Sequence, residues 1–134
     1  MVAYSFRPRF IAAIESGEKR QTIRADRKRH ARAGEQLQLY TGMRTRRCRL
    51  LARATCCAVM PIRLDLAEGR IEFPSTGTAL TTFMELTEFA LQDGFPAWRG
   101  PDGMLAFWKA EHGDAPIFSG VMIRWADLDP WLPT

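Results

Sequence analysis

The first residues of the chain change from an alternating pattern to a helical one. Residues 2–6 alternate between apolar and polar positions and predict a short strand. Pro8 then begins a predicted helix, because a proline in the first helical turn loses no backbone hydrogen bond. Gly17 ends this helix. The apolar face of the helix consists of Phe10, Ile11 and Ile14.

The next segment, residues 21–24, is predicted to be extended. Side chains on a strand point alternately to its two faces, so Thr22 and Arg24 are expected on one face and Ile23 on the other, toward the core. The two polar side chains are therefore expected to line the same cleft. Residues 33–35 (Ala-Gly-Glu) predict the turn that follows.

The middle of the chain has the pattern of a β-sheet. Residues 36–40 alternate strictly, which is a strong strand signal, and residues 48–60 are rich in apolar and small residues and predict a long strand. Pro61 is expected to end that strand. Residues 62–66 and 70–73 are expected to form a hairpin.

A helical segment follows the residues 76–78. Thr81 or Thr82 is the expected N-cap, and Glu85 lies three residues after Thr82, as in a capping box. Gly94 is expected to end the helix.

A second helix and a final strand complete the chain. The helix begins at Pro96 or at the turn of residues 101–103 and ends near Gly113, and residues 118–125 form the last strand. Because strands and helices do not alternate regularly, the order predicts a mixed α+β domain with a small, mainly antiparallel sheet or barrel and flanking helices.

Length and composition set limits on this picture. The chain has 134 residues, which predicts one domain over residues 1–134. The composition is 46% hydrophobic and 25% charged, which is typical of a soluble protein, and no apolar run approaches the roughly 20 residues that cross a bilayer. The first residues lack the pattern of a secretory signal. We therefore expect a cytoplasmic protein with no membrane partner, and a monomer is favoured.

Cysteines and histidines give no sign of a metal site. The odd number of cysteines, Cys48, Cys56 and Cys57, includes no pair at zinc-ligand spacing, and His30 and His112 are far apart. The adjacent Cys56 and Cys57 are expected to be buried, reduced thiols. No metal and no cofactor is predicted.

The polar segment after the first helix is the main candidate for function. Residues 17–24 place an amine (Lys19), a hydroxyl (Thr22) and a guanidinium (Arg24) at a junction between a helix and a strand. Side chains from both elements can converge there on a site for an anionic or amide-bearing ligand. The alternative interpretation is a basic loop exposed to solvent.

Positive charge is concentrated in the first 53 residues, which carry 14 Lys or Arg against four Asp or Glu, whereas the rest carries five against 11. Arginine suits phosphate because its planar fork donates two hydrogen bonds at once, and 12 of the 14 cations are Arg. Nucleic acid or a nucleotide is the expected partner, with exposed solubilising loops as the alternative. The candidate ligand-binding residues are Arg20, Arg24, Arg27, Lys28, Arg29, Tyr40, Arg44, Arg46 and Arg47.

An ordered set of motifs resembles the ASCH domain family and covers the chain from about Ser5 to Trp125. The motifs are Gly17-Glu18-Lys19 with Thr22-Ile23-Arg24, Ala33 to Tyr40, Gln92-Asp93-Gly94-Phe95, Phe107-Trp108, and Gly120 to Trp125. The resemblance implies a fold like the PUA domain, a small β-barrel with helices beside a cleft, and a role related to RNA.

One branch of the family removes the acetyl group from N4-acetylcytidine with a Lys, a Thr and a Glu. Carried over by motif, these positions fall on Lys19, Thr22 and Asp93, so this chain has Asp where that branch has Glu. Amide hydrolysis needs a nucleophile, a base and an acid, and these three side chains supply one each. A Lys base needs a lowered pKa, which burial and Arg24 favour and Asp93 opposes.

Two hypotheses result. The first is an RNA- or nucleotide-binding protein, in which Tyr40, Phe73 or Trp98 stacks on a base while the arginines hold phosphates. The alternative is a small amidohydrolase that acts on N4-acetylcytidine or a related acylated nucleoside.

Overall fold

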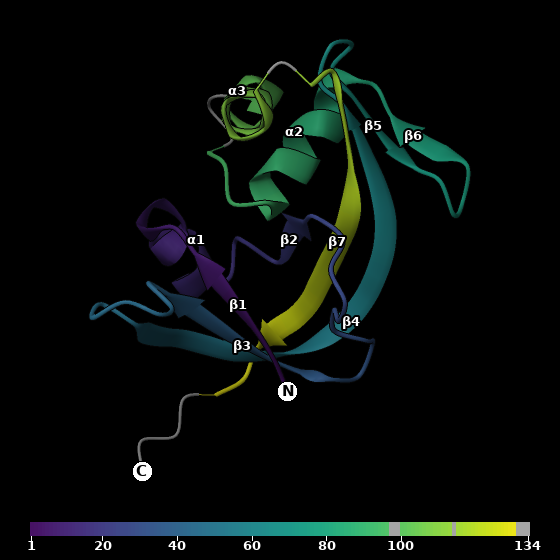
Figure 1. Ribbon diagram of the computed structural model, residues 1–134. Coiled ribbons are helices and arrows are strands. Elements are labelled where there is room, and N and C mark those ends of the chain that lie inside the picture. Colours follow the sequence, from purple (N-terminus) through teal and green to yellow (C-terminus); the bar gives the residue numbers. More distant parts are fainter. Residues whose placement is uncertain (97–99, 114, 131–134) are drawn as a thin grey trace.

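The computed structural model has a mixed α+β fold built on a seven-stranded, mostly antiparallel sheet (Figure 1). It describes residues 1–96, 100–113 and 115–130. In chain order the elements are β1 (Val2–Phe6), the short 3₁₀ helix η1 (Pro8–Phe10), α1 (Ile11–Glu15), β2 (Gln21–Arg24), β3 (Gln36–Thr41), β4 (Arg49–Asp65), β5 (Arg70–Phe73), β6 (Thr78–Leu80), α2 (Phe83–Gln92), α3 (Gly100–His112) and β7 (Ile117–Leu128).

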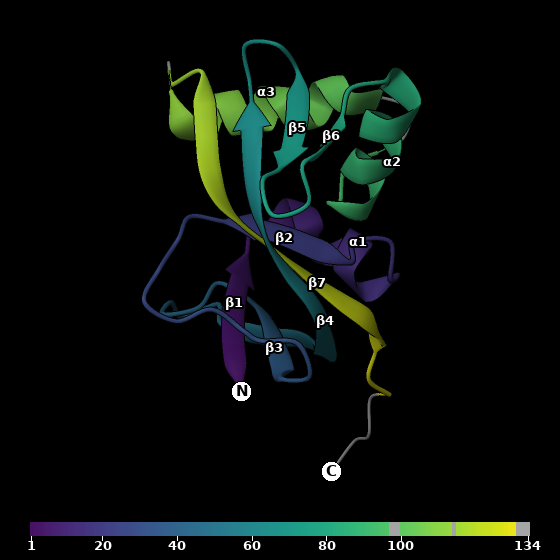
Figure 2. The same cartoon turned by 90° about the vertical axis from the view of Figure 1, so that its right-hand side faces the viewer.

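Two long strands, β4 and β7, hold the sheet together (Figure 2). They pair antiparallel along most of their length, and β4 also pairs with β3 at its start and with β5 at its end. β7 carries β2 on its other side, and β1 joins β3 as the parallel pair. Along this path β1 and β2 are therefore two edges of the sheet, and both contribute to the site described below.

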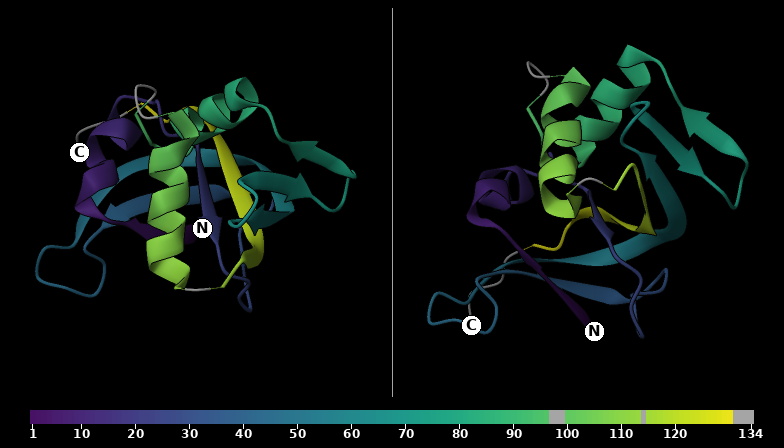
Figure 3. Two further views of the ribbon diagram at one scale, coloured as in Figure 1. Left: turned by 90° about the horizontal axis from the view of Figure 1, so that it is seen from above. Right: turned by 45° about the horizontal axis from the view of Figure 1, so that its top comes forward.

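The sheet curves around the helices. Irregular register between Ala54 and Ala58 marks where β4 bends against β7, as expected of β-bulges. Figures 1 and 3 show α1, α2 and α3 on the concave side of these long strands, whereas the β5–β6 hairpin extends away from them. The core between the layers includes Ile14, Leu37, Leu39, Ile62, Ile71, Met104 and Ile123, each at most 1% exposed. No helix of the described residues has the length and apolar character to span a membrane.

The prediction that Pro61 ends the long strand is wrong. β4 continues to Asp65, and Pro61 lies opposite Val121 of β7. On the other side of β4, β3 pairs only with the part from Arg49 to Thr55, and the pairing with β5 begins at Arg63. Pro61 lies between these two stretches. A proline is tolerated in a strand where one side lacks a neighbour, because its missing N–H leaves no ladder partner unpaired.

The other elements follow the predicted pattern with two differences. Thr82 caps α2 and Glu85 completes the capping box, as expected. The strand β6, which pairs with β5, was not predicted, because three residues are too few to give an alternating signal. The last strand extends to Leu128 because β4 continues to pair with it.

The cysteine prediction holds for one residue of the adjacent pair. Cys56 is 1% exposed, whereas Cys57 is exposed, since neighbouring residues of β4 point to opposite faces and one face of the strand meets solvent. Burial raises the pKa of the Cys56 thiol, which keeps it protonated.

Candidate functional site

Backbone hydrogen bonds hold the short loop that follows α1, and they fix the position of Lys19. Gly17 adopts a positive φ of 83° and turns the chain out of the helix. The backbone N–H of Lys19 then donates to the carbonyl of Ala13 at 2.9 Å, and that of Arg20 donates to the carbonyl of Gln92 at 2.8 Å. The loop is thereby tied to α1 and to the end of α2.

Asp93 reaches the same place from the C-terminus of α2. Its backbone N–H donates to the carbonyl of Phe89, and Gly94 follows with a φ of 98°, a conformation that favours glycine. A Cβ atom on Gly94 would lie 2.8 Å from Cδ of Lys19 and 3.0 Å from Cδ1 of Phe10. Gly94 is therefore required both for the turn and for the close approach of the Lys19 side chain.

Lys19 and Asp93 form a buried pair. The Nζ atom of Lys19 donates to the backbone carbonyl of Asp93 and lies 3.8 Å from Oδ1 of its carboxylate, and both side chains are 3% exposed. Burial lowers the pKa of Lys19 to about 8; the carboxylate of Asp93 opposes this, and Arg24 and Arg9 add to it. The expected directions are thus confirmed, with burial as the largest cause.

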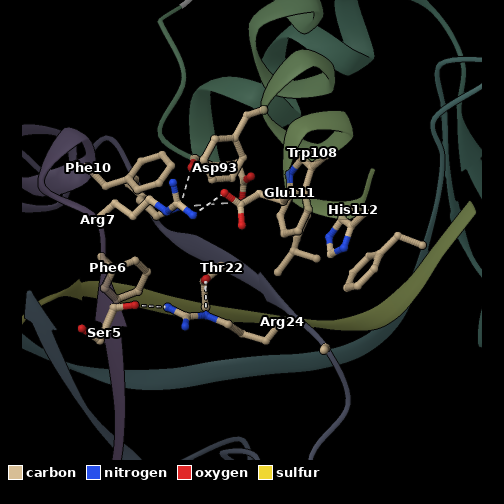
Figure 4. Close-up of a pocket in the computed structure, with 15 residues that line it drawn as sticks. Ser5, Phe6, Arg7, Phe10, Thr22, Arg24, Asp93, Trp108, Glu111 and His112 are labelled. Atoms are coloured by element: carbon tan, nitrogen blue, oxygen red, sulfur yellow. Dashed lines mark hydrogen bonds and ion pairs between the residues drawn. The ribbon is translucent and has the colours of Figure 1, made fainter. Parts of the chain in front are cut away.

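Burial has the opposite effect on the acid. It raises the pKa of Asp93, against the influence of Lys19, Gln21, Trp108 and Arg24. Oδ1 of Asp93 and Nε1 of Trp108 are both buried without a hydrogen bond of good geometry, although the indole lies close enough to influence the carboxylate. Figure 4 shows the indole nitrogen on the side of Asp93.

Thr22 and Arg24 share one face of β2, as predicted. The Nε atom of Arg24 donates to Oγ1 of Thr22 at 3.0 Å, and its Nη2 donates to the carbonyl of Ser5 on β1 at 2.6 Å (Figure 4). Ile23 points away into the core. Because Thr22 accepts this bond, its own hydrogen is free to be donated.

Aromatic rings lie beside the buried Lys19 and the half-buried Arg24. Nζ of Lys19 lies 4.6 Å from the ring centroid of Phe10 and 5.6 Å from that of Phe6. The guanidinium carbon of Arg24 lies 4.8 Å from the Phe6 centroid and 5.3 Å from that of Tyr4. The rings attract the cations through their negative faces and exclude water at the same time.

These side chains line one cavity of about 220 Å³. Lys19, Thr22, Arg24 and Asp93 are all part of its wall. Sequence reasoning did not identify the rest of the wall, which comes from the end of β1, from α3 and from the start of β7. These additional lining residues include Ser5, Arg7, Phe107, Trp108, Glu111, His112 and Phe118.

An ion pair joins the two newly found sides of the cavity. Arg7, just after β1, pairs with Glu111 on α3 (Figure 4). The pattern of α3 offered one signal, since Glu111 and His112 lie three and four residues after Trp108 and therefore on the same helix face.

Most of the other predicted ligand-binding residues lie outside the cavity. Arg20 pairs with Asp127 at 2.7 Å and Arg29 pairs with Glu35 at 2.6 Å. Arg27 is exposed but close to Arg24, and its guanidinium carbon lies 4.7 Å from the Tyr4 ring centroid. Exposed positions away from the cavity lining are occupied by Lys28, Arg44, Arg46 and Arg47.

Of the aromatic residues proposed to stack on a base, Tyr40 and Phe73 are not part of the cavity lining. Tyr40 is half-buried on β3, and Phe73 lines a separate groove beside Phe89. Trp98 lies outside the described residues. Within residues 1–96, 100–113 and 115–130, no group of three or more His, Cys, Asp or Glu side chains is arranged to hold a metal ion.

Comparisons with protein families, with characterised proteins and with solved structures gave no match to this chain. The resemblance to the ASCH domain therefore stays a prediction from the sequence.

Proposed function

We propose that the cavity is the active site of a small amidohydrolase that acts on N4-acetylcytidine or a related acylated nucleoside. The observation that carries this proposal is the buried Lys19–Asp93 pair, with the pKa of Lys19 lowered to about 8, in the same cavity as the Thr22 hydroxyl. The resemblance to the ASCH domain supplies the substrate class.

Lys19 acts as the base. A lysine with a pKa near 8 is partly neutral at physiological pH, whereas an exposed lysine is fully protonated. Its Nζ atom donates one hydrogen bond to the backbone carbonyl of Asp93. In this proposal, the lone pair of the neutral amine accepts the hydroxyl proton of Thr22.

Thr22 is the nucleophile and Arg24 activates it. The hydrogen bond from Nε of Arg24 to Oγ1 of Thr22 holds the positive guanidinium next to the oxygen that becomes an alkoxide. Among the described residues, Arg24 forms no ion pair, whereas the other two cations of the cavity wall do: Lys19 pairs with Asp93 and Arg7 pairs with Glu111. Its charge stabilises the oxyanion of the tetrahedral intermediate.

The reaction has two steps. In the first, Oγ1 of Thr22 attacks the acyl carbon while Lys19 takes the hydroxyl proton, the C–N bond breaks, and Lys19 gives the proton to the leaving amine. In the second, water hydrolyses the Thr22 ester: its hydroxyl joins the acyl carbon, and its proton restores the threonine. The products are the free nucleoside and a carboxylic acid.

The size and lining of the cavity suit a planar ring with a small acyl group. Its volume of about 220 Å³ is below the range of roughly 300–1,000 Å³ of drug-sized sites, so one ring system fills it. Phe6, Phe10, Phe107, Trp108 and Phe118 provide apolar faces for such a ring.

A PUA-like barrel is part of the same proposal. The edges β1 and β2 are linked by the side chain of Arg24, which donates to the carbonyl of Ser5. This link supports an arrangement in which the two edges approach each other as in a barrel that is closed partly by side chains.

A second candidate function, binding of RNA or a nucleotide, has its own support. Arg44, Arg46 and Arg47 are exposed, and none of them forms an ion pair among the described residues. Their loop starts beside the cavity, because the N–H of Met43 donates to Oγ of Ser5 at 3.2 Å. Such a loop is placed to hold phosphates of a nucleic acid whose modified base enters the cavity.

The test of the amidohydrolase is an incubation of the protein with a panel of N4-acylated cytidines, followed by chromatography for cytidine. Release by the wild type but not by Lys19→Ala supports the proposal. No release at high protein concentration contradicts it and favours the binding function.

A further inference from the structure

His112, at the C-terminal end of α3, is held in an aromatic stack at the cavity wall. Its ring centroid lies 5.1 Å from that of Trp108 with an interplanar angle of 6°, and 4.1 Å from that of Phe118 with an angle of 20°. The rings of Trp108 and Phe118 are themselves 5.4 Å apart. The orientation of the imidazole is therefore set by its neighbours, and the residue belongs to the cavity lining (Figure 4).

The imidazole has an unused hydrogen-bonding atom. Nε2 of His112 is buried and has no hydrogen-bond partner among the described residues. Asp93 Oδ1 and Trp108 Nε1 are the other buried atoms of this wall without a hydrogen-bond partner among the described residues, and the Trp108 side chain lies close enough to lower the pKa of Asp93. Glu111, the neighbour of His112, is paired with Arg7. Among the described residues, no polar side chain is therefore placed to pair with Nε2 of His112.

Packing alone does not require a histidine here. Phenylalanine has a somewhat larger planar ring that can stack on Trp108 and Phe118 in the same way, without a buried polar atom that lacks a partner. The ring nitrogens are the property that a histidine adds, and His112 is part of the cavity lining.

We propose that His112 is a fourth substrate-contacting residue, which donates a hydrogen bond from a ring nitrogen to the carbonyl oxygen of the pyrimidine ring of the acylated nucleoside. This inference rests on the proposed function and extends it to recognition of the base. In this arrangement Lys19, Thr22 and Arg24 act on the acyl group, while His112 selects the ring that carries it.

The test compares the wild type with His112→Phe and His112→Gln on two substrates. N4-acetylcytidine has the ring carbonyl, and 2-acetamidopyridine keeps the acylated amine beside a ring nitrogen but lacks the carbonyl. His112→Phe keeps the aromatic stack and is expected to lower kcat/KM for N4-acetylcytidine about 10- to 100-fold, mainly through KM, while 2-acetamidopyridine is hydrolysed at an unchanged rate. His112→Gln restores a donor and is expected to recover part of the loss.

The outcomes separate this inference from the proposed function. If the wild type hydrolyses N4-acetylcytidine and His112→Phe does so equally well, with the same preference between the two substrates, His112 is only a packing residue and the inference is overturned, while the hydrolase stands. If the wild type hydrolyses neither substrate, the proposed function fails, and equilibrium dialysis with N4-acetylcytidine tests His112 directly. Weaker binding by His112→Phe then supports the contact, and equal binding or no binding overturns it.

Discussion

The Nζ atom of Lys19 lies 3.8 Å from Oδ1 of Asp93, in a pair whose side chains are both 3% exposed. A charged pair at this depth loses most of its hydration, and each member is shifted toward its neutral form. Such a pair contributes little to stability compared with apolar side chains of the same volume. Its chemical consequence is an amine that releases its proton near neutral pH.

The rate of amide hydrolysis is expected to rise with pH through about 8, because the neutral form of Lys19 is the base. Asp93 raises the pKa of Lys19, so Asp93→Asn removes that effect and is expected to shift this limb of the profile to lower pH. The measurement is kcat/KM for N4-acetylcytidine from pH 5.5 to 9.5, and the exposed Asp26→Asn serves as the control with an unshifted profile. A limb that moves to higher pH in Asp93→Asn would contradict the assignment of Lys19 as the base.

Thr22→Val removes the hydroxyl and keeps the shape of the side chain. It is expected to lower kcat at least about 100-fold, because the nucleophile is lost, whereas Thr22→Ser keeps the nucleophile and stays within about tenfold of the wild type. Thr22→Val also removes the acceptor for Nε of Arg24, which destabilises the protein. The free energy of unfolding in urea is therefore measured together with the kinetics. Full activity in a folded Thr22→Val protein would exclude Thr22 as the nucleophile.

Gly94→Ala tests the turn that brings Asp93 to Lys19. Alanine at a φ of 98° is strained, and its Cβ atom overlaps the Lys19 side chain and Phe10, so the free energy of unfolding is expected to fall by about 2 to 5 kcal/mol. Gly34→Ala is the matched control, because Gly34 has a φ of 92° but no atom within 4 Å of its added Cβ. That control is expected to lose only about 1 to 2 kcal/mol.

Urea unfolding of both variants gives the comparison. Equal losses in the free energy of unfolding for Gly94→Ala and Gly34→Ala would show that the contact between Gly94 and Lys19 does not constrain the site. A larger loss for Gly94→Ala, with activity reduced in that variant alone, is the expected result.

Those parts of the site that depend on neighbouring residues in the sequence could be predicted from it. Period-two alternation put Thr22 and Arg24 on one face, and the hydrogen bond between them confirms it. The capping box at Thr82 and the glycine at position 94 fixed both ends of α2, and Asp93 lies at the second of these.

The remaining wall of the cavity depends on contacts between distant elements. The pairing of Arg7 with Glu111 requires α3 to lie over the end of β1, which no local pattern encodes. The continuation of β4 through Pro61 likewise depends on its neighbouring strands, because β7 pairs with β4 at Pro61 whereas β3 and β5 do not. Charge clusters were the least informative signal, because Arg20 and Arg29 are engaged in surface ion pairs.

The exposed arginines of the β3–β4 loop provide a separate test of nucleic-acid binding. Replacing Arg44, Arg46 and Arg47 together by Ala is expected to weaken binding of a single-stranded oligoribonucleotide and to reduce the slope of log K against log salt by about 2, since each phosphate contact on a single strand contributes about 0.7. Hydrolysis of a free nucleoside is expected to be unchanged. The control replaces Arg63 and Arg70, which lie near Glu72 instead. An unchanged slope in the triple variant would remove this loop from any nucleic-acid interface.

The most direct measurement is the initial rate of cytidine release from N4-acetylcytidine by the wild type, Lys19→Ala and Lys28→Ala. Lys28 is an exposed lysine outside the cavity lining, so its replacement removes the same chemical group without touching the site. We expect release by the wild type and by Lys28→Ala at similar rates, and none by a folded Lys19→Ala protein. Release that survives in Lys19→Ala, or its absence in the wild type, would contradict the assignment of this cavity as an amidohydrolase site.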